Sequence, residues 1–225
     1  MLVTGMKEID ELRIPARNSF LVIGEPRSSK LIFLEQVLFQ NLKTNSYCIF
    51  ITTEKSAGSI LEDLSKFGWD VSNFLKERRL FFIDCCSVYL ENPQEAENTV
   101  LIDSLSALND ITINLTNLLR EIPQEAQVLI ILHSLSTLLQ YNKTEEIYRF
   151  LQVLILRLLQ RRSIILVEID ETMHEEKVVN MIKHLVNNII EFRKEVTSTF
   201  RIRGTVNTEW FKYLIGKDGM EILFY

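Results

Sequence analysis

Short apolar runs of strand length alternate with helical patterns along most of this chain, and this alternation limits the folds that it can adopt. The expected strands are 20–23, 47–52, 80–85, 99–102, 128–132, 163–168 and 188–193. The expected helices are 31–42, 56–67, 114–121, 145–160 and 175–184. Strands that are apolar on both faces and separated by helices form a parallel sheet with helices on both sides.

The end of the chain follows a different pattern. Residues 198–203, 210–215 and 220–224 read as strands, with turns at Gly204 and Gly216, so we expect an antiparallel extension at one edge of the sheet. The polar stretch 91–98 predicts a loop. With 225 residues, 47% of them hydrophobic, and no repeat or long linker, the sequence predicts a single α/β domain over 1–225.

Composition bears on partners and compartment. The net charge of −5 argues against an extended basic face for nucleic acid. The first residues do not resemble a secretory signal, and no apolar run reaches the roughly 18 residues of a membrane span. The three cysteines show no metal-ligand spacing, which favours a reducing, cytoplasmic setting, with the adjacent pair Cys85 and Cys86 interpreted as small core residues.

The first strand, the loop after it and the next helix form the context in which a phosphate-binding P-loop occurs. The P-loop pattern is G-x-x-x-x-G-K-[ST]. Gly24 and Lys30 match it, but Ser29 stands at the second glycine and Leu31 at the magnesium-binding hydroxyl. The predicted nucleotide-binding residues are Gly24, Glu25, Pro26, Arg27, Ser28, Ser29, Lys30 and Leu31.

Several short motifs resemble, in order and spacing, the KaiC-like members of the RecA ATPase superfamily over nearly the whole chain. They are Thr4-Gly5-Met6-Lys7-Glu8-Ile9-Asp10-Glu11-Leu12, Thr53-Glu54-Lys55-Ser56, Phe67-Gly68-Trp69-Asp70, Leu80-Phe81-Phe82-Ile83-Asp84 and Arg201-Ile202-Arg203-Gly204-Thr205. Residues 135–142 are most similar to archaeal KaiC/RadA-like proteins. The resemblance implies a RecA-like P-loop NTPase fold, with ATP bound at the carboxyl ends of the parallel strands between subunits of a ring or filament.

The resemblance also implies roles for individual residues. Lys30 would neutralise the β- and γ-phosphates, and Glu54 would be the catalytic residue that polarises the attacking water. Lys55 replaces the second acid of the family's Glu-Glu pair. Arg201 and Arg203 would reach the nucleotide of a neighbouring subunit, where such arginines contribute rate factors of roughly 10³–10⁵ in related phosphoryl transfer.

The metal site departs from the family at two positions. Leu31 cannot bind magnesium, and His133 stands where the family has an aspartate, although magnesium prefers hard oxygen ligands. An alternative alignment places that acid at Asp103. We reject it because 128–139 is followed by the expected long helix and strand. We therefore predict no well-bound magnesium, and we interpret His174 and His184 as solvated.

These departures favour a KaiC-like protein that is catalytically impaired. It would bind ATP or ADP weakly at most and act in regulation or assembly, as a homo-oligomer or with a KaiC/RadA-like relative. One alternative is a slow ATPase that uses Lys30, Glu54 and a neighbour's Arg201 and Arg203. A DNA-associated, recombinase-like protein is another, which the acidic net charge does not support.

Overall fold

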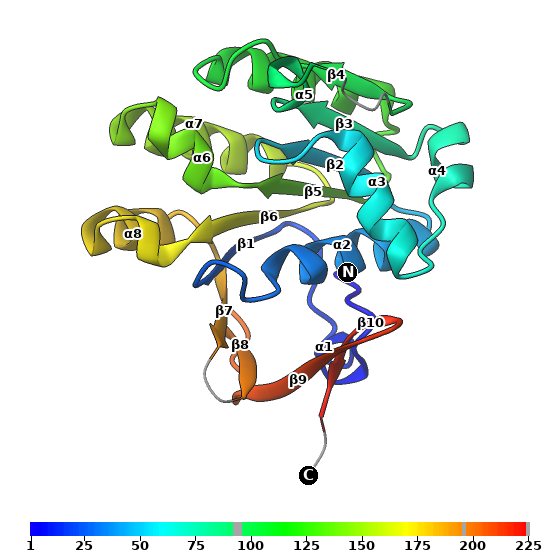
Figure 1. The fold of residues 1–225 in the computed structure, drawn as a ribbon, viewed down its shortest axis with the longest axis vertical. Coiled ribbons are helices and arrows are strands. Elements are labelled where there is room, and N and C mark those ends of the chain that lie inside the picture. The colour runs from blue at the N-terminus through cyan, green and yellow to red at the C-terminus, as the bar shows by residue number, and fades with distance from the viewer. Residues whose placement is uncertain (92–95, 195–196, 224–225) are drawn as a thin grey trace.

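A ten-stranded sheet runs through the whole molecule in the computed structural model, which describes residues 1–91, 96–194 and 197–223 (Figure 1). The strands are β1 (Asn18–Gly24), β2 (Tyr47–Thr52), β3 (Leu80–Asp84), β4 (Thr99–Leu101), β5 (Val128–His133), β6 (Ser163–Asp170), β7 (Asn188–Lys194), β8 (Ser198–Gly204), β9 (Phe211–Gly216) and β10 (Gly219–Ile222). Their order is β10-β9-β8-β7-β1-β6-β5-β2-β3-β4. Every pairing from β7 to β4 is parallel.

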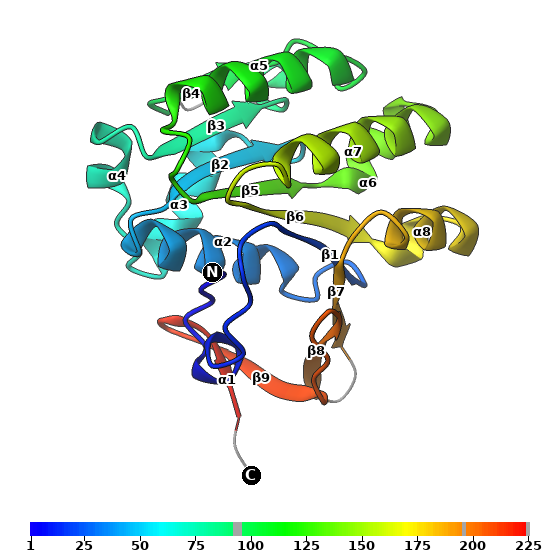
Figure 2. The ribbon, with the colours of Figure 1, turned by 180° about the vertical axis from the view of Figure 1, so that it is seen from behind.

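Helices cover both faces of the parallel part (Figures 1 and 2). The helices are α1 (Lys7–Asp10), α2 (Lys30–Lys43), α3 (Ala57–Lys66), α4 (Ser72–Lys76), α5 (Leu108–Glu121), α6 (Leu135–Tyr141), α7 (Thr144–Leu158) and α8 (Glu176–Lys183), with 3₁₀ turns η1 (Ser87–Tyr89) and η2 (Glu171–Met173). Helices α2 and α3 pack on one face, and α5 to α8 pack on the other. Among the described residues, no helix is long and apolar enough to cross a membrane.

Alternate residues of each central strand enter two different cores. In β1, Phe20 and Val22 pack with α2 and α3, whereas Leu21 and Ile23 pack with the helices of the opposite face. Successive side chains of a strand point to opposite faces. A strand buried on both faces must therefore be apolar throughout, which is why the unbroken apolar runs predicted this parallel sheet correctly.

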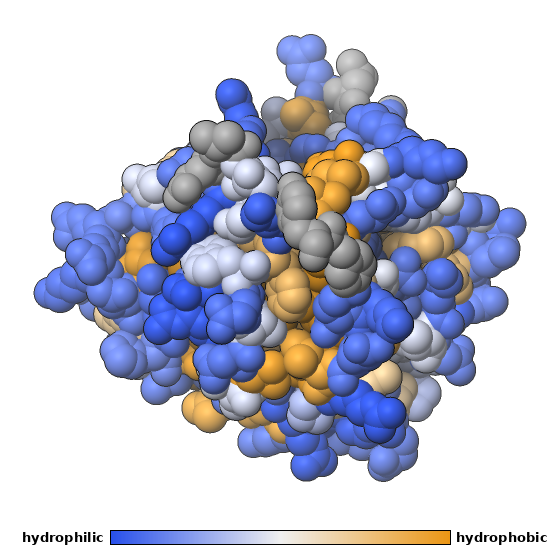
Figure 3. All heavy atoms as spheres, turned by 90° about the horizontal axis from the view of Figure 1, so that it is seen from below, coloured by the Kyte–Doolittle hydropathy of each residue, from blue (hydrophilic) through white to orange (hydrophobic). Residues whose placement is uncertain are grey.

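The predicted antiparallel extension is confirmed. Strand β8 pairs antiparallel with β7 and β9, and β10 pairs antiparallel with β9. Gln36 of α2 ties this extension to α2 and to the N-terminal segment, because its side-chain amide bonds the backbone of Met220 and the carbonyl oxygen of Thr4. On the face seen from below, where Figure 1 places β9 and β10, apolar atoms gather at the surface (Figure 3); on β9, Leu214 and Ile215 are 40% and 37% exposed.

Some expected boundaries were wrong. The helix expected at 114–121 begins six residues earlier, at Leu108, and α6 follows β5 directly, where the sequence predicted only the later long helix. Ile111 is fully buried, so tertiary packing overrides the low helix propensity of the polar residues around it. Residues 92–95 of the expected loop and residue 224 of the last expected strand lie outside the described part.

Candidate functional site

Four neighbouring strands end at the candidate site. Strands β1, β6, β5 and β2 are adjacent and parallel, so their carboxyl ends meet at one edge of the sheet (Figure 1). The cavity there has a volume of about 500 Å³ and is lined by Arg27, Ser28, Ser29, Lys30, Leu31, Ile32, Glu54, Lys55, His133, Glu168 and Asp170. This edge is where ligands bind in open α/β sheets.

The loop between β1 and α2 keeps a strained backbone. Arg27 and Ser29 have φ values of 63° and 64°, in the left-handed region that costs residues with a Cβ about 1–2 kcal/mol. Gly24 is held close to β7, since a Cβ there would lie 2.8 Å from the carbonyl oxygen of Phe192. The backbone at Ser29 therefore has the conformation for which a P-loop uses glycine.

Replacing Ser29 with glycine should raise the free energy of unfolding by about 1 kcal/mol, because glycine adopts this φ value without strain. The melting temperature should rise by about 2–4 °C, which differential scanning calorimetry can measure. Ser29→Ala is the matched control, since it removes the hydroxyl but keeps the Cβ. Equal stabilisation by both variants would show that the hydroxyl, not the backbone strain, is responsible.

Bonds from within the chain hold this loop in place. The Ser28 hydroxyl donates to the carbonyl oxygen of Glu25 at 2.7 Å, and the Tyr213 hydroxyl donates to the carbonyl oxygen of Ser28 at 2.9 Å. Tyr213 is buried, and this burial raises the pKa of its hydroxyl. Through Tyr213, strand β9 of the antiparallel extension thus holds the loop at Ser28.

Lys30 lines the cavity, but its ammonium is bonded to groups of the protein itself. Its side chain is only 4% exposed, and its ammonium donates to the carbonyl oxygens of Gly24 and Glu25 at 3.1 and 2.8 Å. The same Nζ lies 2.5 Å from Asp170 Oδ1 and 3.3 Å from Glu168 Oε1. The ammonium that the sequence assigned to nucleotide phosphates is therefore paired with two carboxylates of β6.

Glu168 also joins Lys30 to His133. Its other carboxylate oxygen lies 3.0 Å from His133 Nδ1, and both side chains are buried. Burial acts to raise the pKa of Glu168, but the hydrogen bond and charge of His133, together with Lys30, hold that pKa below its usual value. Glu168 is thus an ionised group in a buried polar network that also includes His133.

Glu54 lies on the open side of this network. Its side chain is 39% exposed, and its Oε1 accepts a hydrogen bond from the Thr137 hydroxyl at 2.7 Å. Its Oε2 is 3.8 Å from His133 Nε2. Glu54 is therefore more exposed than Glu168 and Asp170, the other two carboxylates that line the cavity.

A family model described as "ATPase: KaiC" matches residues 2–213. The chain belongs to the KaiC ATPase family. The KaiC-like protein PH0186 of Pyrococcus horikoshii has the same fold, with a TM-score of 0.73 over 99% of both chains at 15% identity. The expected mostly parallel, RecA-type fold is thus confirmed.

Curated relatives match only part of the chain. The UPF0273 protein PH0284 of Pyrococcus horikoshii is 27% identical over 53% of this chain and 49% of its own length. The circadian clock oscillator protein KaiC of a Picosynechococcus species is 31% identical over 37% of this chain and 16% of its own length. The chain spans about half the length of the UPF0273 proteins that it matches.

The family implies a magnesium ion at this site, but the residues present do not fit one. Leu31 offers no oxygen ligand, and His133 offers an imidazole that is bonded to Glu168. The nearby oxygens of Glu168 and Asp170 are paired with the Lys30 ammonium. Within the described residues, no group of three or more histidine, cysteine, aspartate or glutamate side chains has metal-binding geometry.

The two arginines predicted to act on a neighbouring subunit are paired within their own chain. On β8, Arg201 Nε lies 2.5 Å from Glu191 Oε2, and Arg203 Nη1 lies 3.3 Å from Oε1. The Arg201 guanidinium also stacks over Trp210, 4.4 Å from the ring centroid. Their action on a neighbour's nucleotide stays a prediction, and it would require them to leave Glu191.

Other sequence interpretations meet mixed outcomes. His174 is not simply solvated, because its Nε2 lies 2.8 Å from the Ser136 hydroxyl, whereas His184 is exposed.

Cys85 is buried, and burial raises its pKa to about 12. Burial also raises the pKa of Cys86. A raised pKa disfavours the reactive thiolate, which agrees with the interpretation of this pair as small packing residues.

Proposed function

We propose that this member of the KaiC ATPase family is catalytically impaired, binds ATP or ADP weakly at most, and acts in regulation or assembly. The supporting observation is the buried pairing of Lys30 with Glu168 and Asp170. A nucleotide phosphate can reach the Lys30 ammonium only if those ion pairs break. The protein would then act through contacts with copies of itself or with a catalytically intact KaiC/RadA-like relative.

Replacing the two carboxylates by a nucleotide phosphate as the partner of Lys30 is unfavourable in free energy. Removing one partner of a buried ion pair costs about 3–5 kcal/mol, because the other charge is left uncompensated. A cost of about 4 kcal/mol corresponds to roughly a thousandfold in affinity. An incoming triphosphate would also face the like charges of Glu168, Asp170 and Glu54, which line the same cavity. The residues at positions 31 and 133 offer no magnesium site to offset that repulsion.

Calorimetric titration with ATP, with and without magnesium, combined with steady-state phosphate release, tests this proposal. We expect weak binding that does not depend on the metal, and phosphate release close to that of buffer alone. Glu54→Gln should leave this background unchanged, because no turnover depends on the carboxylate. Release comparable to that of an intact relative, abolished by Glu54→Gln, would refute the proposal.

A slow ATPase is the second candidate, and the position of Glu54 favours it. This carboxylate lines the cavity from the loop after β2, where it could contact a water molecule bound in the cavity, as a water-polarising residue must. Arg201 and Arg203 of a neighbour would then supply the missing positive charge. Tight ATP binding that requires magnesium would favour this candidate over the first, and the same calorimetric titration separates the two.

A separate experiment, sedimentation velocity, tests the proposed assembly role. Apolar side chains of β9 reach the surface at Leu214 and Ile215. Sedimentation velocity without nucleotide should show a species larger than a monomer, or a complex once an intact relative is added. A protein that stays monomeric in both experiments would contradict the assembly role.

A further inference from the structure

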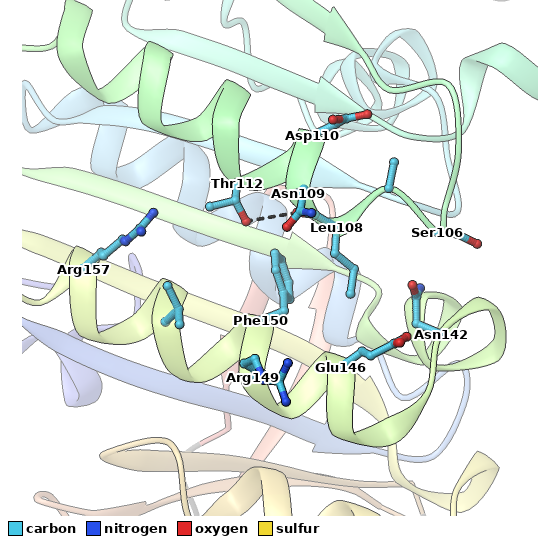
Figure 4. A pocket seen from close by; sticks show the side chains of 12 residues that line it. Ser106, Leu108, Asn109, Asp110, Thr112, Asn142, Glu146, Arg149, Phe150 and Arg157 are labelled. Carbon is cyan, nitrogen blue, oxygen red and sulfur yellow. Dashed lines mark hydrogen bonds between the residues drawn. The ribbon is translucent and has the colours of Figure 1, made fainter.

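Two hollows lie end to end in the groove between α5 and α7, far from the P-loop in sequence. The first has a volume of about 650 Å³ and the second about 620 Å³, and Arg157 lines both. Figure 4 shows the first hollow, with Arg157 at the end away from Asn142 and Glu146. The two ends of this groove differ in charge.

Opposite charges balance in the first hollow. Arg149 and Arg157 of α7 are accompanied by two acids, Asp110 of α5 and Glu146 of α7 (Figure 4). Phe150 lies between the polar side chains and is 8% exposed. This end therefore has no excess charge with which to select an anion or a cation.

Arginines are in excess in the second hollow. Arg120, Arg157 and Arg161 line it, and Glu121 is the acid among its lining residues. Glu121 already pairs with Arg78, its Oε2 lying 2.5 Å from Nη2. In the described part of the chain, no carboxylate is within ion-pair distance of the three arginines of this hollow, and the Arg157 guanidinium has no hydrogen-bond partner there.

Arg161 is buried although it carries a full charge. Its residue is 8% exposed, and its Nη1 and Nη2 donate to the carbonyl oxygens of Leu119 and Pro123, both at 2.9 Å. Its Nε is buried and has no hydrogen-bond partner among the described residues. Burial lowers the pKa of this guanidinium. A buried charge without a counter-charge is unfavourable.

A structural role accounts for only part of this arrangement. By bonding Leu119 and Pro123, Arg161 holds the carboxyl end of α5, whose dipole favours a cation. That role does not require Arg120 and Arg157 to lie beside it, where like charges repel one another. An oxyanion in the hollow would offset much of this positive charge and reduce the repulsion among the three side chains.

We propose that the second hollow, between the carboxyl ends of α5 and α7, is a binding site for a phosphate-type oxyanion. Arg157 and Arg120 would bind the oxyanion directly, because a guanidinium can donate two parallel N–H bonds to a phosphate. Arg161, whose Nη1 and Nη2 already bond Leu119 and Pro123, would contribute positive charge from the buried side of the hollow. The anion would be free inorganic phosphate or the phosphoryl group of a small ligand.

An NMR titration of the ¹⁵N-labelled protein tests this site, with inorganic phosphate as the probe and sodium chloride at equal ionic strength as the reference. The largest chemical-shift changes should fall in residues 119–124 and 157–161. Arg157→Gln should weaken phosphate binding at least about fivefold, since a hydrogen bond to a charged group is lost. Arg149→Gln is the matched control, because it removes the same charge from the same helix outside the second hollow.

Each result then has one meaning. Binding that Arg157→Gln weakens and Arg149→Gln does not supports the site. Tighter binding of phosphoserine than of inorganic phosphate at the same residues would identify a phosphorylated ligand. No phosphate-specific shift, shifts confined to the P-loop, or equal weakening by the two variants would overturn the proposal. Arg157 is exposed, so its replacement is not expected to unfold the protein.

Discussion

Replacing Lys30 with methionine is expected to lower the free energy of unfolding at pH 7 by about 3–5 kcal/mol. Methionine keeps most of the apolar stem but removes the ammonium, so Glu168 and Asp170 lose the cation that pairs with them. The melting temperature should fall by about 10 °C, given the size of the chain. Calorimetry or circular dichroism during heating measures this change directly.

Lys43→Met is the matched control, because it makes the same substitution in the same helix. Lys43 is exposed at the end of α2, so its loss should change stability by no more than about 0.5 kcal/mol. Adding Glu168→Gln to Lys30→Met should recover at least about 1 kcal/mol, because the buried carboxylate is then neutral. A Lys30→Met protein as stable as the unmodified one would show that Lys30 is free to serve a ligand.

This expectation separates the protein from a P-loop ATPase that binds its nucleotide. In such a protein the lysine charge is held for the phosphates, so its loss removes binding more than stability. Here the same charge neutralises two acids of β6, and its loss removes stability. Both proteins have the lysine at the same position, but in this chain its ammonium pairs with Glu168 and Asp170.

The parallel sheet was predictable because burial on both faces requires an unbroken apolar run. The predicted strand 20–23 lies within β1, and the predicted strand 47–52 has the same bounds as β2. The order of the strands was not predictable in this way, because apolar runs state that a strand is buried but not which strand is its neighbour. For the same reason α5 appeared too short, since Asn109 and Asp110 are poor helix formers until Ile111 and Leu115 are packed against the sheet.

Glu168 and Asp170 were missed for a related reason. Glu168 ends the strand that the sequence predicted at 163–168, and Asp170 lies two residues beyond it, but only the pairing of β6 with β1 places them beside Lys30. Two acids spaced by one residue at the end of an otherwise apolar strand were the available signal, because such carboxylates are rarely buried without a partner. The departures from the P-loop and metal-site patterns at Ser29, Leu31 and His133 were visible in the sequence, whereas the carboxylates that pair with Lys30 were not.

A second buried acid makes stability depend on pH. Glu35 of α2 is 1% exposed, and its Oε1 has no hydrogen-bond partner among the described residues. Lys55 and Lys66, the two lysines whose charges act on Glu35, both pair with Asp63 instead. Burial, and then the like charge of Asp63, raises the pKa of Glu35 to about 8.

The sign of the effect follows from proton binding. Between the ordinary pKa of about 4.5 and the raised value of about 8, the folded protein holds a proton on Glu35 that the unfolded chain has lost. Raising the pH through this window therefore lowers the free energy of unfolding. Each unit of pKa difference corresponds to about 1.4 kcal/mol, which sets an upper bound of about 5 kcal/mol on the loss.

Replacing Glu35 with glutamine should remove this dependence, because the amide is neutral at every pH. The variant and the unmodified protein should be similar in stability at pH 5 and should diverge as the pH rises, with the variant more stable by several kcal/mol at pH 8.5. Urea unfolding at a series of pH values measures the difference. Glu145→Gln, which removes an exposed carboxyl from α7, should follow the unmodified protein throughout. A constant offset between the Glu35→Gln protein and the unmodified one across this range would show that Glu35 is ionised in the fold, as it would be if Lys55 or Lys66 turned from Asp63 to pair with it.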